Sequence, residues 1–193
     1  MRKLADFLLF SAVFIGLCAV ALCWETNTLL GLQTGRWSLY SFVFGATLLQ
    51  YNLHYFFKKQ HAFHSERQDW SIRNRTTQKI LIGFGLVLSG ISIFWLEPRH
   101  VVVLVVFAAL ASFYSFPLLP LVKKPLKEYG LLKRLLLSLE WTLVTVWFPA
   151  DQQGVDMTSY WLVFFRRFLF MFVLCLLFDL RDKELDAVNG IRT

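Results

Sequence analysis

The chain has 193 residues, of which 56% are hydrophobic and only 17% charged, more apolar side chain than one soluble core of this size buries. This composition argues against a water-soluble domain and predicts an integral membrane protein. The net charge is +7, but the Lys and Arg residues fall between apolar stretches rather than on one soluble face, which argues against nucleic-acid binding. The cysteines, Cys18, Cys23 and Cys175, lie within apolar stretches and lack the spacing of a disulfide framework or a zinc site.

Six apolar stretches approach or reach the length of about 20 residues that a helix needs to cross a bilayer. They cover residues 4–24, 39–57, 80–96, 101–119, 131–150 and 160–178. Each is expected to be helical, because unpaired backbone groups are costly in lipid. The first stretch has some features of a cleaved signal peptide, but its length favours a retained helix. We therefore predict an all-α, polytopic transmembrane bundle of about six spans, forming a single integral membrane domain over residues 1–193.

Basic residues alternate between the two ends of these expected spans. The amino terminus, the second connection and the fourth connection hold most of them: Arg2 and Lys3; Lys58, Lys59, Arg67, Arg73, Arg75 and Lys79; Lys123, Lys124, Lys127, Lys133 and Arg134. The first and third connections carry Arg36 and Arg99, and the fifth carries no basic residue. By the positive-inside rule, the basic connections and both termini are expected on the cytoplasmic side.

Three carboxylates follow directly after the last apolar stretch. If the helix continues past Phe178, then Asp179, Asp182 and Asp186 lie within an arc of roughly 60° on one face. Such a stripe suits Mg²⁺, which takes one or two carboxylates together with substrate phosphate oxygens and waters. The alternative is a solvated charged run that closes a transmembrane helix.

These residues carry a resemblance to a known family. The segment "FDLRDKELD" resembles the second aspartate-rich motif of the UbiA prenyltransferase superfamily. The segments "YSF" and "GLLKRLLLSLEWTLVT" are similar to that family's fourth and fifth helices, and the resemblance covers essentially the whole chain in span order. It implies a helical bundle around a central cavity, in which Mg²⁺ and a polyprenyl diphosphate are held and the prenyl group passes to an acceptor, often aromatic.

The resemblance also assigns roles to individual residues. Asp179, Asp182 and Asp186 would hold Mg²⁺, and Asp182, Asp186 and Lys133 would form the catalytic set. The diphosphate would contact Tyr114, Lys133, Arg134, Arg181 and Asn52.

Two features depart from the family pattern. The first aspartate-rich motif is degenerate in "YNLHYFFKKQ": Asn52 remains, but Leu53, Phe56 and Gln60 stand where the family has Asp, and His54 is either a substitute ligand or a structural residue. Family members usually have about nine spans, so the chain is expected to be either a fragment of a nine-span protein or a reduced relative.

Three ionisable residues fall at membrane depth: Glu140 in the fifth stretch, and Arg166 and Arg167 in the sixth. We predict that Glu140 pairs with one arginine while the other reaches toward the interface. Two alternatives to an enzyme stay open on these observations. One is a non-catalytic membrane protein of the same fold that binds an isoprenoid lipid or a partner, and the other is a small transporter that uses the three ionisable residues.

Overall fold

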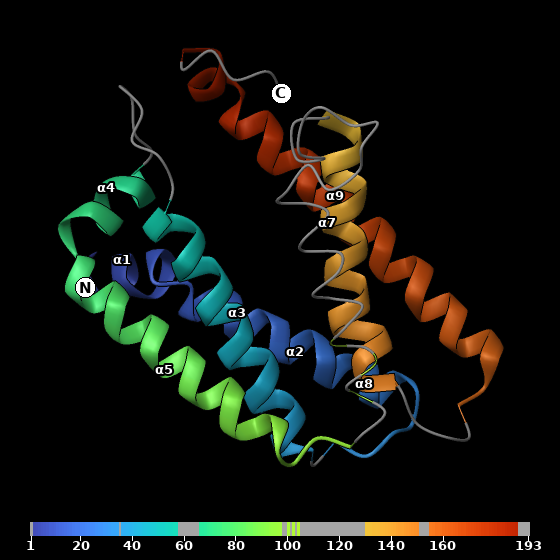
Figure 1. Cartoon of the computed structure of the whole chain (residues 1–193). Helices are drawn as coiled ribbons and strands as arrows, with labels where there is room; N and C mark the ends of the chain where they lie inside the picture. The colour runs from blue at the N-terminus through green and yellow to red at the C-terminus, as the bar shows by residue number, and fades with distance from the viewer. Residues whose placement is uncertain are drawn as a thin grey trace, which may run out of the picture. The chain divides into compact units, whose positions relative to one another are not determined.

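The computed structural model describes residues 2–34, 36–57, 66–97, 100, 102, 104, 130–150 and 155–188. Within these ranges 89% of the residues are helical and no strand occurs, so the all-α prediction is confirmed. The chain divides into two compact units, one formed by residues 1–25 and 33–96 and the other by residues 26–32 and 97–193. Each unit is described separately below (Figure 1).

The first unit begins with a broken helix. The stretch 4–24 was predicted as one continuous helix, but α1 (Arg2–Phe10) stops before Ser11, and α2 (Val13–Leu29) starts after Ala12. Ala12 is buried with a positive φ of 65°, a left-handed conformation that is unfavourable for a residue with a Cβ. A tertiary contact stabilises this break, because the side-chain amide of Asn52 donates a hydrogen bond to the carbonyl of Ser11 at 2.9 Å.

The next two predicted spans, 39–57 and 80–96, appear as α3 (Trp37–Phe57) and α5 (Arg75–Ile93), with the short α4 (Glu66–Arg73) between them in the chain. Helices α3 and α5 pack side by side, as Figure 1 shows. Their backbones approach closely at two glycines. A Cβ added to Gly85 would lie 2.8 Å from the carbonyl oxygen of Gly45, and one added to Gly45 would lie 2.9 Å from the amide nitrogen of Ser89. Small residues at such crossings are typical of helix pairs that pack within membranes.

A chain of buried polar groups joins the elements at one end of this unit. The Ser71 hydroxyl donates to the side-chain oxygen of Gln78 at 2.8 Å, and the Gln78 amide donates to the carbonyl of Asn52 at 3.1 Å. With the bond from Asn52 to Ser11, the network connects α4, α5 and α3 to the break between α1 and α2. Trp70 of α4 adds ring contacts to Phe7 and Phe10 of α1.

The second unit contains the predicted span 131–150 as a helix with an irregular turn. It consists of α7 (Gly130–Thr142), the π-helical turn η2 (Leu143–Trp147) and α8 (Phe148–Ala150). Pro149 has no amide hydrogen, so the carbonyl of Thr145, four residues earlier, cannot receive the usual α-helical bond. The hydroxyl of Thr26 donates to that carbonyl at 2.7 Å, and the buried acceptor is therefore satisfied by a residue far away in the sequence. The predicted span 101–119 lies almost entirely outside the described residues.

The last predicted span, 160–178, is part of the long helix α9 (Met157–Val188). Asp156 caps its amino terminus, because its carboxylate accepts the backbone amide of Ser159 at 2.7 Å. This hydrogen bond lowers the pKa of Asp156 below its usual value of 3.8, since the charged form is the better acceptor.

Two helices among the described residues, Arg75–Ile93 and Met157–Leu180, are long and apolar enough to cross a membrane. Only 11% of the apolar window of α9 is buried, and its exposed side chains are themselves large and apolar, among them Trp161, Phe165 and Leu169. A helix that exposes such a surface would be unfavourable in water. Val13–Leu29 is apolar but shorter, and a bundle of about six spans remains a prediction.

Candidate functional site

The candidate site lies where α7 packs against α9, within the second unit. Along α7 and η2, the residues Arg134, Ser138, Thr142 and Thr145 succeed one another at helical spacing and therefore share one side of the helix. The three hydroxyls are buried, and each donates to a carbonyl of the preceding turn at 2.7 Å, which satisfies it within its own helix. Arg134 extends this buried stripe toward the start of α7.

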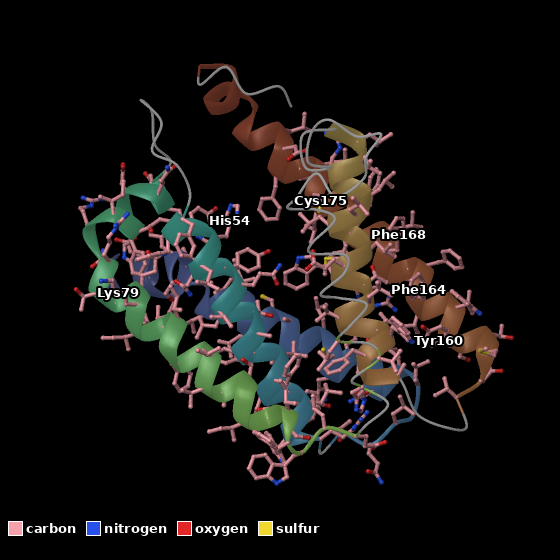
Figure 2. The ribbon with its side chains drawn as sticks, in the orientation of Figure 1. His54, Lys79, Tyr160, Phe164, Phe168 and Cys175 are labelled. Carbon is pink, nitrogen blue, oxygen red and sulfur yellow. The ribbon has the colours of Figure 1, made fainter. Side chains whose placement is uncertain are left out.

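A matching stripe runs along α9. Tyr160, Phe164, Phe168 and Cys175 are partly buried on this helix (Figure 2), and Asp179 follows Cys175 by one helical turn. Neighbouring rings on this stripe contact each other, for example Phe168 and Phe172, whose centroids are 6.3 Å apart in a stacked arrangement. The polar residue Asp179 thus extends a largely aromatic stripe.

The two stripes meet in an ion pair between Arg134 and Asp179. The Nη1 of Arg134 donates to Oδ2 of Asp179 at 3.1 Å, and the two side chains are 21% and 19% exposed. The Nε of the same guanidinium is buried and has no hydrogen-bond partner in the described part of the chain. Because a buried donor without an acceptor is unfavourable, this edge of the guanidinium is suited to an additional anionic ligand. The structure thereby brings together one predicted metal ligand and one predicted diphosphate contact.

The other predicted metal ligands lie on the same helix. Because α9 extends to Val188, the expected continuation of the helix past Phe178 is confirmed. Asp182 and Asp186 therefore occupy register positions on the same stripe as Asp179, and Arg181 lies on the same stretch of helix. Their side chains lie outside the description, as does that of Lys133, which belongs to the first turn of α7; Tyr114 falls outside the described residues altogether.

Asn52 has a packing role in the first unit. It is 2% exposed, and its side-chain nitrogen donates to the carbonyls of both Ser11 and Leu48, at 2.9 and 2.8 Å. An amide nitrogen has two hydrogens to donate, so both are engaged, one at the junction of α1 and α2 and the other within α3. The role predicted for Asn52 in binding diphosphate would require these bonds to be exchanged.

The remaining candidates differ in exposure. His54 is exposed at the end of α3 (Figure 2), and its ring meets the ring of Tyr55 edge to face at 5.3 Å. On α9, Arg167 is only 4% exposed whereas Arg166 is exposed, which agrees with one arginine turned inward and the other outward. This makes Arg167 the better candidate partner for Glu140, although the pairing itself stays a prediction.

Sequence reasoning missed two parts of this arrangement. It did not pair Arg134 with Asp179, which lie 45 positions apart on separate helices. It also missed Thr26, for which a signal was present, because Pro149 within an apolar helix leaves an acceptor that some other donor must satisfy.

The donor set can be compared with what a divalent cation requires. Among the described residues no group of three or more His, Cys, Asp and Glu side chains is close enough to hold a metal ion. Asp179 is the member of the acidic stripe whose side chain is described, and with Asp182 and Asp186 in register the stripe supplies the oxygen donors that Mg²⁺ prefers. Comparisons of the chain with family models, curated proteins and solved structures found no match.

Proposed function

We propose that this chain is a multi-pass membrane protein related to the UbiA prenyltransferases, and that it transfers a prenyl group from an allylic polyprenyl diphosphate to an acceptor. The observation that carries the proposal is the contact between Arg134 of α7 and Asp179 of α9. Asp179 is the first of the three carboxylates that share one face of α9, with Asp182 and Asp186. The contact supports the proposal because the guanidinium of Arg134, which could bind a diphosphate, lies beside the carboxylate of Asp179, which could bind Mg²⁺. The residues that resemble the family's second motif are thus helical and adjacent to a basic residue of another helix.

The membrane setting is supported by the composition of the helices. Helices α5 and α9 expose large apolar side chains along lengths sufficient to cross the bilayer. The distribution of Lys and Arg assigns the amino terminus, the connection before α5 and the carboxyl end of α9 to the cytoplasmic side. In this orientation the proposed site opens to the cytoplasm, where a water-soluble diphosphate group would enter.

The roles of the residues follow from their chemistry. Arg134, with Lys133, Arg181 and Tyr114, would bind and orient the diphosphate, and the cationic members would stabilise the negative charge that grows on it as the allylic carbon–oxygen bond breaks. Asp179, Asp182 and Asp186 would hold Mg²⁺, which when bound supplies Lewis-acid stabilisation of the leaving group. The aromatic stripe of α9 would exclude water from the reacting carbon.

One observation favours a second candidate, a non-catalytic protein that binds an isoprenoid diphosphate or lipid. The first aspartate-rich motif lacks its carboxylates, and its remaining Asn52 is engaged in packing between helices. A protein with one acidic stripe would bind the diphosphate without ionising it.

Binding is tested by thermal stabilisation of the detergent-purified protein with farnesyl diphosphate, in Mg²⁺ and in EDTA. We expect stabilisation in Mg²⁺ alone, and its loss in both Asp182→Asn and Asp186→Asn. Asp156→Asn is the matched control, because it removes a carboxylate at the opposite end of the same helix and keeps a capping side chain. Equal stabilisation in EDTA, or an unchanged response in both Asp182→Asn and Asp186→Asn, would show that these carboxylates are only solvated charges at the end of a helix.

Release of inorganic diphosphate from farnesyl diphosphate, measured with the protein in native membranes that supply acceptors, separates the two candidates. Release that requires Mg²⁺ and Asp182 supports the transferase. Binding that depends on Mg²⁺ but is followed by no release supports the non-catalytic protein.

A further inference from the structure

We propose that the Arg134–Asp179 ion pair is a latch that closes the diphosphate site until Mg²⁺ is present. This inference rests on the proposed function and adds the way in which that site is regulated. In the closed state the carboxylate of Asp179 occupies a guanidinium donor that would otherwise face a phosphate oxygen. In the open state Asp179 turns to the metal and Arg134 turns to the diphosphate.

The geometry of the pair supports this exchange. Arg134 uses its Nη1 for Asp179, at 3.1 Å, while its buried Nε has no hydrogen-bond partner within the described chain. A guanidinium binds a phosphate best through two parallel N–H bonds, and a pair of donors that includes Nε is one of its binding edges. Among the described residues, the guanidinium thus has one donor engaged by a carboxylate and a buried Nε without an acceptor, and a phosphate that bonded to both edges would satisfy it better.

The surroundings hold both groups in position for the exchange. The carbonyl of Arg134 accepts the buried hydroxyl of Ser138 at 2.7 Å, which ties the guanidinium-bearing turn to the packed face of α7. Asp179 lies one turn after Cys175 on the partly buried stripe of α9. Because the two residues lie on helices that pack against each other, we expect the latch to open by rotation of the two side chains.

The charges explain why the metal is needed. A diphosphate that approaches Arg134 in the absence of Mg²⁺ meets the negative carboxylate of Asp179 and must also displace it from the guanidinium. Both effects oppose binding, and a divalent cation held by the carboxylate would offset both. The latch therefore makes metal and diphosphate binding mutually favourable, and each ligand must raise the affinity for the other by the same factor.

This model makes a prediction that a simple metal-ligand role for Asp179 does not make. If Asp179 only binds Mg²⁺ and repels an approaching anion, then Asp179→Asn weakens diphosphate binding in Mg²⁺, and any gain in EDTA is the same whether or not Arg134 is present. If Asp179 is also the latch, the same substitution frees Arg134, and binding in EDTA becomes tighter than in the wild type by a factor that is lost when Arg134 is replaced. Because exposed and partly exposed ion pairs are weak, the expected gain is about three- to tenfold in Kd.

The experiment is isothermal titration of the detergent-purified protein with geranyl diphosphate, in EDTA and in Mg²⁺. The variants are Asp179→Asn, Asp179→Ser in case Asn re-forms a hydrogen bond to the guanidinium, and Asp156→Asn as the control at the other end of α9. The double variant Asp179→Asn/Arg134→Gln, compared with Arg134→Gln alone, tests whether the gain acts through the guanidinium. We expect tighter binding in EDTA for both Asp179 variants, wild-type binding for the control, and loss of the gain in the double variant.

Two failures are distinguishable. If the wild type binds geranyl diphosphate in Mg²⁺ while both Asp179 variants bind it in EDTA no more tightly than the wild type, the latch is refuted and the proposed function stands. If the double variant keeps the gain, the latch is likewise refuted, because the effect does not pass through Arg134. If the wild type binds in neither condition, the proposed function fails, and the latch fails with it.

Discussion

The close approach of α3 and α5 predicts a strong difference between neighbouring glycines of one helix. Gly85 faces α3, and a Cβ there would lie 2.8 Å from the carbonyl oxygen of Gly45 and 2.9 Å from the amide nitrogen of Leu49. Gly83 belongs to the same helix, but a Cβ there would have nothing within 4 Å. Gly83→Ala is therefore a matched control for Gly85→Ala in helix propensity.

The magnitude follows from two opposing terms. Replacing Gly with Ala inside a helix stabilises it by about 0.5 to 1 kcal/mol, and this term is the same at both positions. At Gly85 the new methyl group meets backbone atoms, which cannot rotate away, and such overpacking costs about 1 to 3 kcal/mol. Gly83→Ala should therefore be neutral or stabilising, and Gly85→Ala should be less stable than Gly83→Ala by about 1 to 3 kcal/mol. For a chain of this size the difference corresponds to roughly 3 to 8 °C in Tm.

The assay is thermal unfolding of the detergent-solubilised protein, followed by circular dichroism, with Gly90→Ala as a second control because that position is also open. Gly45→Ala should behave like Gly85→Ala, since its Cβ would lie 2.9 Å from the amide nitrogen of Ser89. The double variant should lose less than the sum of the single losses, because the first methyl group already separates the helices. Equal Tm values for Gly85→Ala and Gly83→Ala would refute the close crossing.

Three further predictions concern other parts of the chain. Thr26→Val should lower the free energy of unfolding by about 1 to 3 kcal/mol, because it removes the hydroxyl that donates to the buried carbonyl of Thr145. Thr26→Ser keeps the hydroxyl and should unfold near the wild-type temperature, and similar losses in both variants would contradict the role of the hydroxyl. The amide hydrogen bond at the start of α9 lowers the pKa of Asp156, so the charged cap stabilises the fold above the usual pKa of 3.8, and this stabilisation is lost as the pH falls through the lower folded value. The Tm deficit of Asp156→Ala should therefore shrink below pH 3.8. A deficit that is constant with pH would refute a charged cap. For topology, single cysteines at Glu66 and Met157 in a background without the native cysteines should react differently in intact cells, with position 157 labelled by an impermeant thiol reagent and position 66 protected, and the reverse pattern would invert the proposed orientation.

The sequence by itself determined the positions of α3, α5 and α9. The apolar stretches at 39–57 and 80–96 became α3 and α5, and the last stretch became part of α9, because an apolar segment of this length satisfies its backbone only by forming its own hydrogen bonds. The helical register of Asp179, Asp182 and Asp186 was likewise predictable, since spacing along one helix is a local property. None of these inferences required knowledge of which helices are neighbours.

The tertiary structure decided everything that depends on contacts between distant segments. The break at Ala12 is stabilised by Asn52, 41 positions from Ser11, and the carbonyl left by Pro149 is satisfied by Thr26, 119 positions from Thr145. The pairing of Arg134 with Asp179 likewise needed the packing of α7 on α9. Hydropathy could not reveal these partners, because it reports only how apolar each segment is. A hydrogen bond or an ion pair depends instead on which side chain of another helix lies within about 3 Å.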